Sequence, residues 1–263
     1  MAPTVAGLAS ALSASGVQRL GDAATADGGM ARLLAGAGIA QLLAAERLAA
    51  AAGITTATLP HAGAGSSGAP GGSAPAAGPP QSTCPSPAPA PNDPDPDPDT
   101  GQATTATGTA EVPGKALAAA VTTEQQSIYA YQAALPRLKP EDSGAAATFL
   151  GQHQELAAAA AARSTAACSA AQAQQPGFVL DPGFLAAPGD GLRRLELAAL
   201  PAYGNIIAQA DGGLRIWAIG ALQSAARRAA HWDGAVGPVP GVLLDQGQLP
   251  ELPASPAPVP TGT

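Results

Sequence analysis

The chain has 263 residues and a formal net charge of −7, and although 46% of the residues are hydrophobic, only 3% are aromatic. Most of the apolar residues are alanine, which has the highest intrinsic helix propensity, so the composition favours helices. Basic and acidic side chains are equal in number between Lys115 and Asp233, and no basic patch with interleaved aromatic residues is present, which argues against nucleic-acid binding.

Residues 1–57 predict an N-terminal helical segment that docks on the rest of the protein and covers apolar surface. Leucine and isoleucine recur on one broad helical face between Leu34 and Leu48, and Gly53 is a stop signal; residues 5–20 predict a shorter helix. No run reaches the roughly 18 apolar residues of a membrane-spanning helix. The first residues lack the pattern of a signal peptide, so the protein is cytoplasmic or its true start lies upstream of Met1.

Residues 58–110 predict a disordered linker rich in glycine, proline and aspartate. The Asp-Pro alternation at 93–99 spreads its carboxylates along an extended chain, whereas calcium needs converging ligands. Cys84 lies in this linker and Cys168 near a helix end. Their spacing fits neither a metal site nor a redox motif, and the sequence allows either a disulfide between them or two free thiols.

Residues 111–234 predict a four-helix bundle, and the fold class is all-α. The four helices are expected at about 113–138, 141–173, 190–210 and 214–232. A long Pro/Gly-rich connection separates the second helix from the third, and two hairpins joined by a longer connection are typical of a four-helix bundle. The Pro-rich residues 235–263 are expected to be a disordered tail.

Three of these helices place a polar residue on a stripe that should face inward. In the first helix, apolar residues at 117, 121, 128, 131 and 135 leave one heptad position open, and Glu124 occupies it. His153 and Glu196 occupy equivalent gaps in the second and third helices. A buried carboxylate is costly unless it is paired, protonated or bound, so these residues are the candidate site.

The C-terminal half resembles a known family over about 120 residues, in "EQQSIYAYQAAL", "QHQEL", "LRRLELAALPAYGNII" and "AARRAAHW". These motifs resemble the ferritin-like domain of unknown function found in exported proteins of high-GC Gram-positive bacteria. The matching positions are Glu124, Tyr129, Tyr131, His153, Leu195, Glu196, Ala202, Tyr203, Arg227, Arg228 and Trp232. The resemblance implies a ferritin-like up-down four-helix bundle in a bacterial protein, at the cell envelope or outside the cell.

The ligand count argues against a complete di-metal centre, which needs about four acidic ligands and two histidines. Leu150 stands where the glutamate of a Glu-x-x-His pair would be, and the fourth helix offers only His231 as a ligand. Glu124, His153 and Glu196 could together hold a single iron or manganese ion.

The alternatives to a metal site are a buried polar network and partial exposure of the two glutamates. In the network, Glu124 and Glu196 accept hydrogen bonds from His153, from Tyr131 or Tyr203, or from an arginine. An imidazole between two carboxylates tends to be charged.

The sequence favours a degenerate ferritin-like domain of structural or protein-interaction type, with no cofactor and no catalytic residue. The rival is a metal-binding or redox ferritin-like protein that uses Glu124, His153 and Glu196.

No serine has a histidine base at motif spacing. We further expect Tyr129 and Tyr131 to lie on different faces of the first helix. The tryptophans and paired arginines have structural explanations. Tryptophans at 217 and 232 are expected to fill the core, and arginines at 193, 194, 227 and 228 to line solvated faces. A protein partner fits this reading, and the sequence does not specify an oligomeric state.

Overall fold

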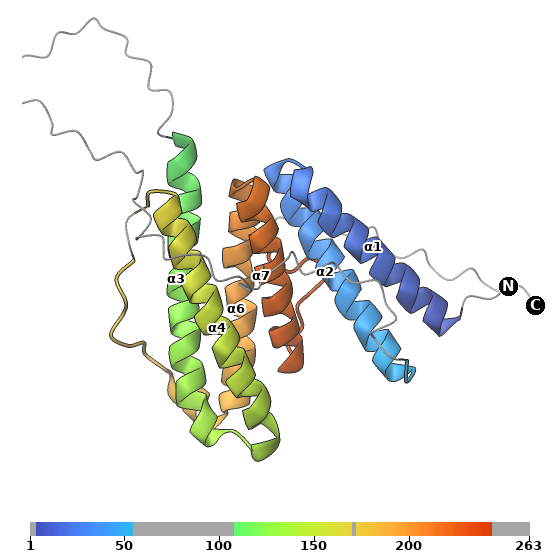
Figure 1. Ribbon diagram of the computed structural model, residues 1–263. Helices are drawn as coiled ribbons and strands as arrows, with labels where there is room; N and C mark the ends of the chain where they lie inside the picture. Colours follow the sequence, from blue (N-terminus) through green and yellow to red (C-terminus); the bar gives the residue numbers. More distant parts are fainter. Residues whose placement is uncertain (1–3, 55–107, 170–171, 244–263) are drawn as a thin grey trace, which may run out of the picture.

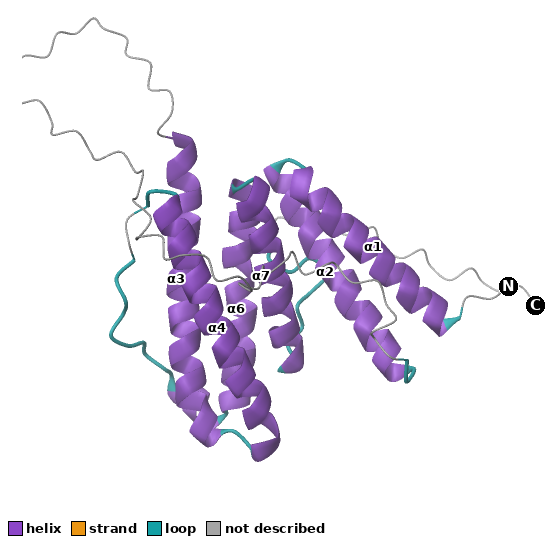
Figure 2. Cartoon of the chain, viewed as in Figure 1, coloured by secondary structure: helices purple, strands orange, loops and turns teal. Residues whose placement is uncertain are grey.

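The computed structural model describes residues 4–54, 108–169 and 172–243. These residues are all-helical, as the sequence predicts. No strand occurs among these residues (Figure 2). The helices are α1 (Val5–Thr25), α2 (Gly28–Ala51), α3 (Gly108–Ala134), α4 (Pro140–Ala166), α5 (Pro182–Ala186), α6 (Pro188–Gln209) and α7 (Gly212–His231), and the 3-10 turn η2 (Leu135–Arg137) follows α3.

Helices α3, α4, α6 and α7 lie side by side as two antiparallel hairpins, α3–α4 and α6–α7 (Figure 1). The sequence sets the first hairpin through its prolines. Pro136 lies in η2 and lacks the amide hydrogen that would continue α3. Pro140 begins α4, with Glu141 and Asp142 in its first turn, where negative charge favours the helix N-terminus.

The connection from α4 to α6 is a crossover whose described part lies along α3. The backbone amide of Gln175 donates to Oε1 of Gln125 at 3.4 Å, and the rings of Phe178 and Tyr129 are 6.0 Å apart. Phe184 of α5 then packs into a core cluster with Ala134, near the far end of α3. The crossover therefore spans the bundle, and α4 and α6 point in the same direction (Figure 1).

Helices α1 and α2 form an N-terminal hairpin that packs against α6 and α7 (Figure 1). The two helices approach closely at Gly16 and Gly38, where a Cβ added to Gly16 would lie 2.8 Å from the Gly38 carbonyl oxygen. Ile39 and Leu42 of the hairpin share the largest core cluster with Ile207 of α6. The hairpin therefore completes the hydrophobic core of the bundle.

Several element limits differ from those expected. Helix α1 extends to Thr25, α3 begins at residue 108, and α4 ends at Ala166. The expected tail at 235–263 begins too early, because Pro240 and Gly241 are buried against the helices. Residues 55–107, with Cys84, and residues 244–263 lie outside the described residues. Cys168 takes part in a disulfide.

Helix α2 is the one described helix that is long and apolar enough to cross a membrane, by length and composition alone. However, 44% of the most apolar 18-residue stretch of this helix is buried inside the protein. A core helix of a soluble protein passes the same test, so length and composition do not identify α2 as a membrane-spanning segment.

Candidate functional site

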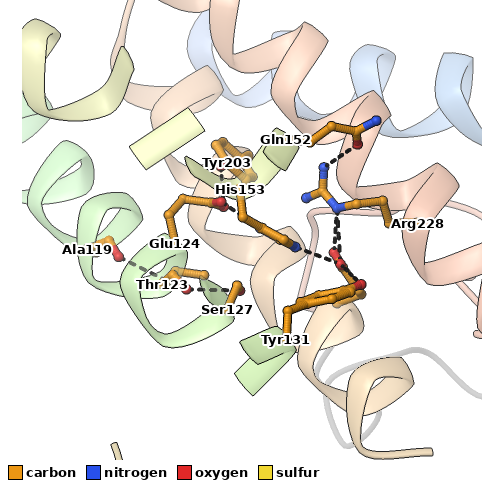
Figure 3. Close-up of polar contacts among 10 residues, drawn as sticks. Ala119, Thr123, Glu124, Ser127, Tyr131, Gln152, His153, Tyr203 and Arg228 are labelled. Carbon is orange, nitrogen blue, oxygen red and sulfur yellow. Dashed lines mark hydrogen bonds and ion pairs between the residues drawn. The ribbon is translucent and has the colours of Figure 1, made fainter. Parts of the chain in front are cut away.

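The three sequence-predicted residues Glu124, His153 and Glu196 meet in the interior of the bundle, and all three side chains are 0% exposed. His153 of α4 lies between the two carboxylates, and Figure 3 shows it beside Glu124. Its Nδ1 is 2.7 Å from Oε2 of Glu124 on α3, and its Nε2 is 2.9 Å from Oε1 of Glu196 on α6. The imidazole therefore links the two α-hairpins of the bundle.

Two buried tyrosines, also predicted from the sequence, extend this contact. The hydroxyl of Tyr203 donates to Oε1 of Glu124 at 2.5 Å. The hydroxyl of Tyr131 donates to Oε1 of Glu196 at 2.7 Å, and it accepts a hydrogen bond from Nε1 of Trp232 at 2.8 Å. Tyr129, which lies on another face of α3, is 38% exposed. Trp232 thus has a polar role as well as a packing role.

The fourth bundle helix contributes Arg228, and the expectation that this arginine lies on a solvated face is wrong. Its Nε is 3.0 and 3.1 Å from the two carboxylate oxygens of Glu196, its Nη1 donates to Gln152 at 3.4 Å, and it is 1% exposed. The neighbouring Arg227 is 43% exposed and pairs with Glu46. The spacing of Ala221, Ala225, Arg228 and Trp232 is the signal that identifies Arg228 as inward-facing.

The buried charges balance one another. Carboxylate oxygens only accept hydrogen bonds, so an imidazole with both nitrogens on carboxylates carries both protons and a positive charge. Burial alone would lower the pKa of His153, but the hydrogen bonds to Glu124 and Glu196 outweigh it and raise the pKa. For Glu196, burial favours a higher pKa, but the bond from His153 and the charge of Arg228 outweigh it and lower the pKa. Two anions and two cations therefore share the interior.

The atoms that would bind a metal ion are engaged by protein partners. All four carboxylate oxygens of Glu124 and Glu196 accept hydrogen bonds, and both ring nitrogens of His153 are used. A metal ligand needs a deprotonated imidazole nitrogen, and the charge of Arg228 beside Glu196 opposes a second cation. Within the described parts of the chain, no group of three or more His, Cys, Asp or Glu side chains is placed to hold a metal.

Replacing Tyr203 with phenylalanine tests how completely Glu124 is desolvated. The change removes the hydrogen bond to Oε1 of Glu124 and keeps the ring, so we expect the free energy of unfolding to fall by about 1–3 kcal/mol. The control is Tyr129→Phe at the exposed tyrosine, which should change it by less than about 0.5 kcal/mol. Urea denaturation measures both. Equal small effects would show that water reaches the Glu124 carboxylate.

Residues 116–243 match a protein family described as a domain of unknown function (DUF4439). The matched range begins within α3 and ends after α7, so it contains all the residues of the buried network and leaves out the α1–α2 hairpin. No curated protein and no solved structure matches the chain.

Proposed function

We propose that residues 108–243 form a degenerate ferritin-like bundle with a structural or protein-interaction role, in which the inward-facing carboxylates hold the helices in register. The observation that carries the proposal is the pairing of the carboxylates. His153 uses both ring nitrogens on Glu124 and Glu196, and α7 supplies Arg228 where a di-metal bundle would require a further acidic ligand.

The connectivity of the helices supports the ferritin-like assignment. Ferritin-like folds have one long crossover among their four bundle helices, and the connection between α4 and α6 is such a crossover. The inward glutamates on α3 and α6 and the inward histidine on α4 belong to the residue types that hold metals in those folds. The family match to residues 116–243 spans the same four helices.

An alanine-rich bundle has a particular need for a polar network. Alanine side chains bury little area and interlock weakly, so helices that slide by one turn lose little apolar contact. Such a slide would separate Arg228 from Glu196, or Tyr203 from Glu124, and leave a buried charge without its partner, which costs several kcal/mol. The network therefore penalises one-turn shifts in register, which is the best-attested use of buried polar groups.

The rival function is metal binding by Glu124, His153 and Glu196, and the short distances among these three residues favour it. It would require His153 to lose a proton and Arg228 to leave Glu196. We also propose a location at the cell envelope or outside the cell. The disulfide at Cys168 supports this location, because disulfides persist in oxidising compartments.

Elemental analysis of the protein purified from its native compartment separates the two functions. The variants are Glu124→Ala and, as a matched control, Glu155→Ala at an exposed position of α4. Our proposal predicts substoichiometric iron and manganese in the wild type and in both variants. Stoichiometric metal that is lost in Glu124→Ala but kept in Glu155→Ala would overturn it.

A further inference from the structure

Residues 234–243, which follow α7, form a strap that touches the N-terminal hairpin and the bundle at once. The carbonyl oxygen of Gly241 accepts hydrogen bonds from Nε and Nη2 of Arg32 on α2, at 2.8 and 2.5 Å. The strap reverses direction at Pro240 and Gly241, where the amide of Val242 donates to the Val239 carbonyl at 3.2 Å. The φ of Gly241 is +86°, and proline followed by a left-handed glycine is the pattern of a type II turn.

The turn fits between α2 and α6 because both helices have glycine at the contact. A Cβ added to Gly204 of α6 would lie 2.1 Å from the carbonyl oxygen of Gly241. A Cβ added to Gly36 of α2 would lie 2.6 Å from Cγ1 of Val239 and 2.8 Å from the carbonyl oxygen of Pro240. A larger residue on either helix would push the strap away. The same contact thus joins three segments that are far apart in the sequence.

Further contacts tie the hairpin to α6 and α7 on either side of the strap. Gly28 packs so closely on α6 that an added Cβ would lie 2.0 Å from the Ala208 carbonyl oxygen. The guanidinium of Arg215 donates to the carbonyl oxygen of Ala26, which lies just before α2. The contacts therefore combine close backbone approach, hydrogen bonds to carbonyl oxygens and the shared apolar core.

We infer that α6, α7 and the strap form a docking surface for the α1–α2 hairpin, and that this surface holds the hairpin even when the connection between them is cut. The strap is the clamp that holds the hairpin on this surface. The carbonyl oxygen of Gly241 accepts hydrogen bonds from Arg32, and Val239 and Pro240 pack against Gly36. The partner that the surface accepts is a small-residue helical hairpin with glycine at both close approaches. The docking of the hairpin does not depend on whether the buried network is structural or binds a metal.

The test uses the full-length chain with a protease site inserted after Gly71. This position precedes Cys84, so after cleavage both cysteines remain on the C-terminal fragment. Wild-type fragments should co-elute in gel filtration after cleavage. Arg32→Ala removes two hydrogen bonds to Gly241, and Gly36→Ala crowds the turn. We expect each variant to weaken the binding of the hairpin fragment roughly tenfold or more, measured from the concentration dependence of co-elution.

The chain offers a matched control for each variant. Leu33→Ala changes the neighbour of Arg32, a side chain that is 46% exposed. Gly21→Ala introduces a Cβ into α1 with no atom within 4 Å. Both controls should bind as the wild type does. Circular dichroism of the uncut variants measures whether the helices form. Separation of the cleaved wild-type fragments would overturn the docking surface. Wild-type affinity in both Arg32→Ala and Gly36→Ala would overturn the strap as its clamp.

Discussion

Replacing Arg228 with methionine should lower the free energy of unfolding by about 3–5 kcal/mol, because the change leaves the buried carboxylate of Glu196 without its guanidinium partner. Methionine retains most of the length of the side chain, so the effect reports the lost charge more than a lost volume. The same substitution at the adjacent Arg227, whose pair with Glu46 is half exposed, should cost less than about 1 kcal/mol. Urea unfolding of the two variants gives the comparison.

A double-mutant cycle shows whether Arg228 acts through Glu196. In the double variant Arg228→Met with Glu196→Gln, the buried anion is removed together with its partner. We therefore expect the double variant to lose less stability than the sum of the two single variants. Additive losses would mean that the two side chains stabilise the bundle independently. Equal losses in the Arg228 and Arg227 variants would mean that Arg228 is solvated in solution.

Stability should decrease as the pH rises above neutrality, because His153 must keep its proton to serve both carboxylates. The pKa of His153 is raised in the folded protein. Its contribution to the free energy of unfolding is therefore fully present below the pKa of the unfolded state, about 6.5, and is lost as the pH rises through the pKa of the folded state. The slope can reach about 1.4 kcal/mol per pH unit for one proton. In His153→Gln this slope should vanish.

Urea unfolding at a series of pH values from about 6 to about 9 measures the slope. His231→Gln, at an exposed position at the end of α7, is the matched control for replacing a histidine outside the buried network. The groups that face His153 are Glu124 on α3, Glu196 on α6 and Arg228 on α7. At low pH the slope of stability against pH has the opposite sign. The pKa of Glu196 is lowered, so its contribution is lost as the pH falls through that lowered value. A His153→Gln variant with the wild-type slope would contradict the charged imidazole.

Helical periodicity predicted which side chains point inward, since a residue in the gap of an apolar stripe must face the same way as the stripe. Glu124 and Tyr131 follow this rule. The drift of an α-helix against a strict heptad brings Ser127 and Ala134 into the core in place of their neighbours Ile128 and Leu135, which are only half buried. Periodicity therefore gives the face of a helix to within about one residue.

Arg228 was missed because it stands next to a chemically identical residue, and the spacing that selects it runs mostly through alanines. Arg227 and Arg228 lie one position apart in an alanine-rich helix, so the apolar stripe is broad and the two arginines straddle its edge. A buried carboxylate with no cation assigned was a second signal, since it requires a charge partner. The strap was beyond sequence reasoning, because Arg32 and Gly241 are 209 positions apart and nothing local couples them.

The contact between the strap and α2 can form only late in synthesis. The hairpin leaves the ribosome before the bundle helices, and Gly241 follows Arg32 by 209 residues, which is a delay of about 10–40 s at ~5–20 residues per second. For most of that interval α6 and α7 have not yet been made, so they cannot cover Ile39 and Leu42. The alanine- and glycine-rich composition of α2 limits the apolar area that is exposed meanwhile, which reduces the chance that a nascent chain aggregates before α7 is made.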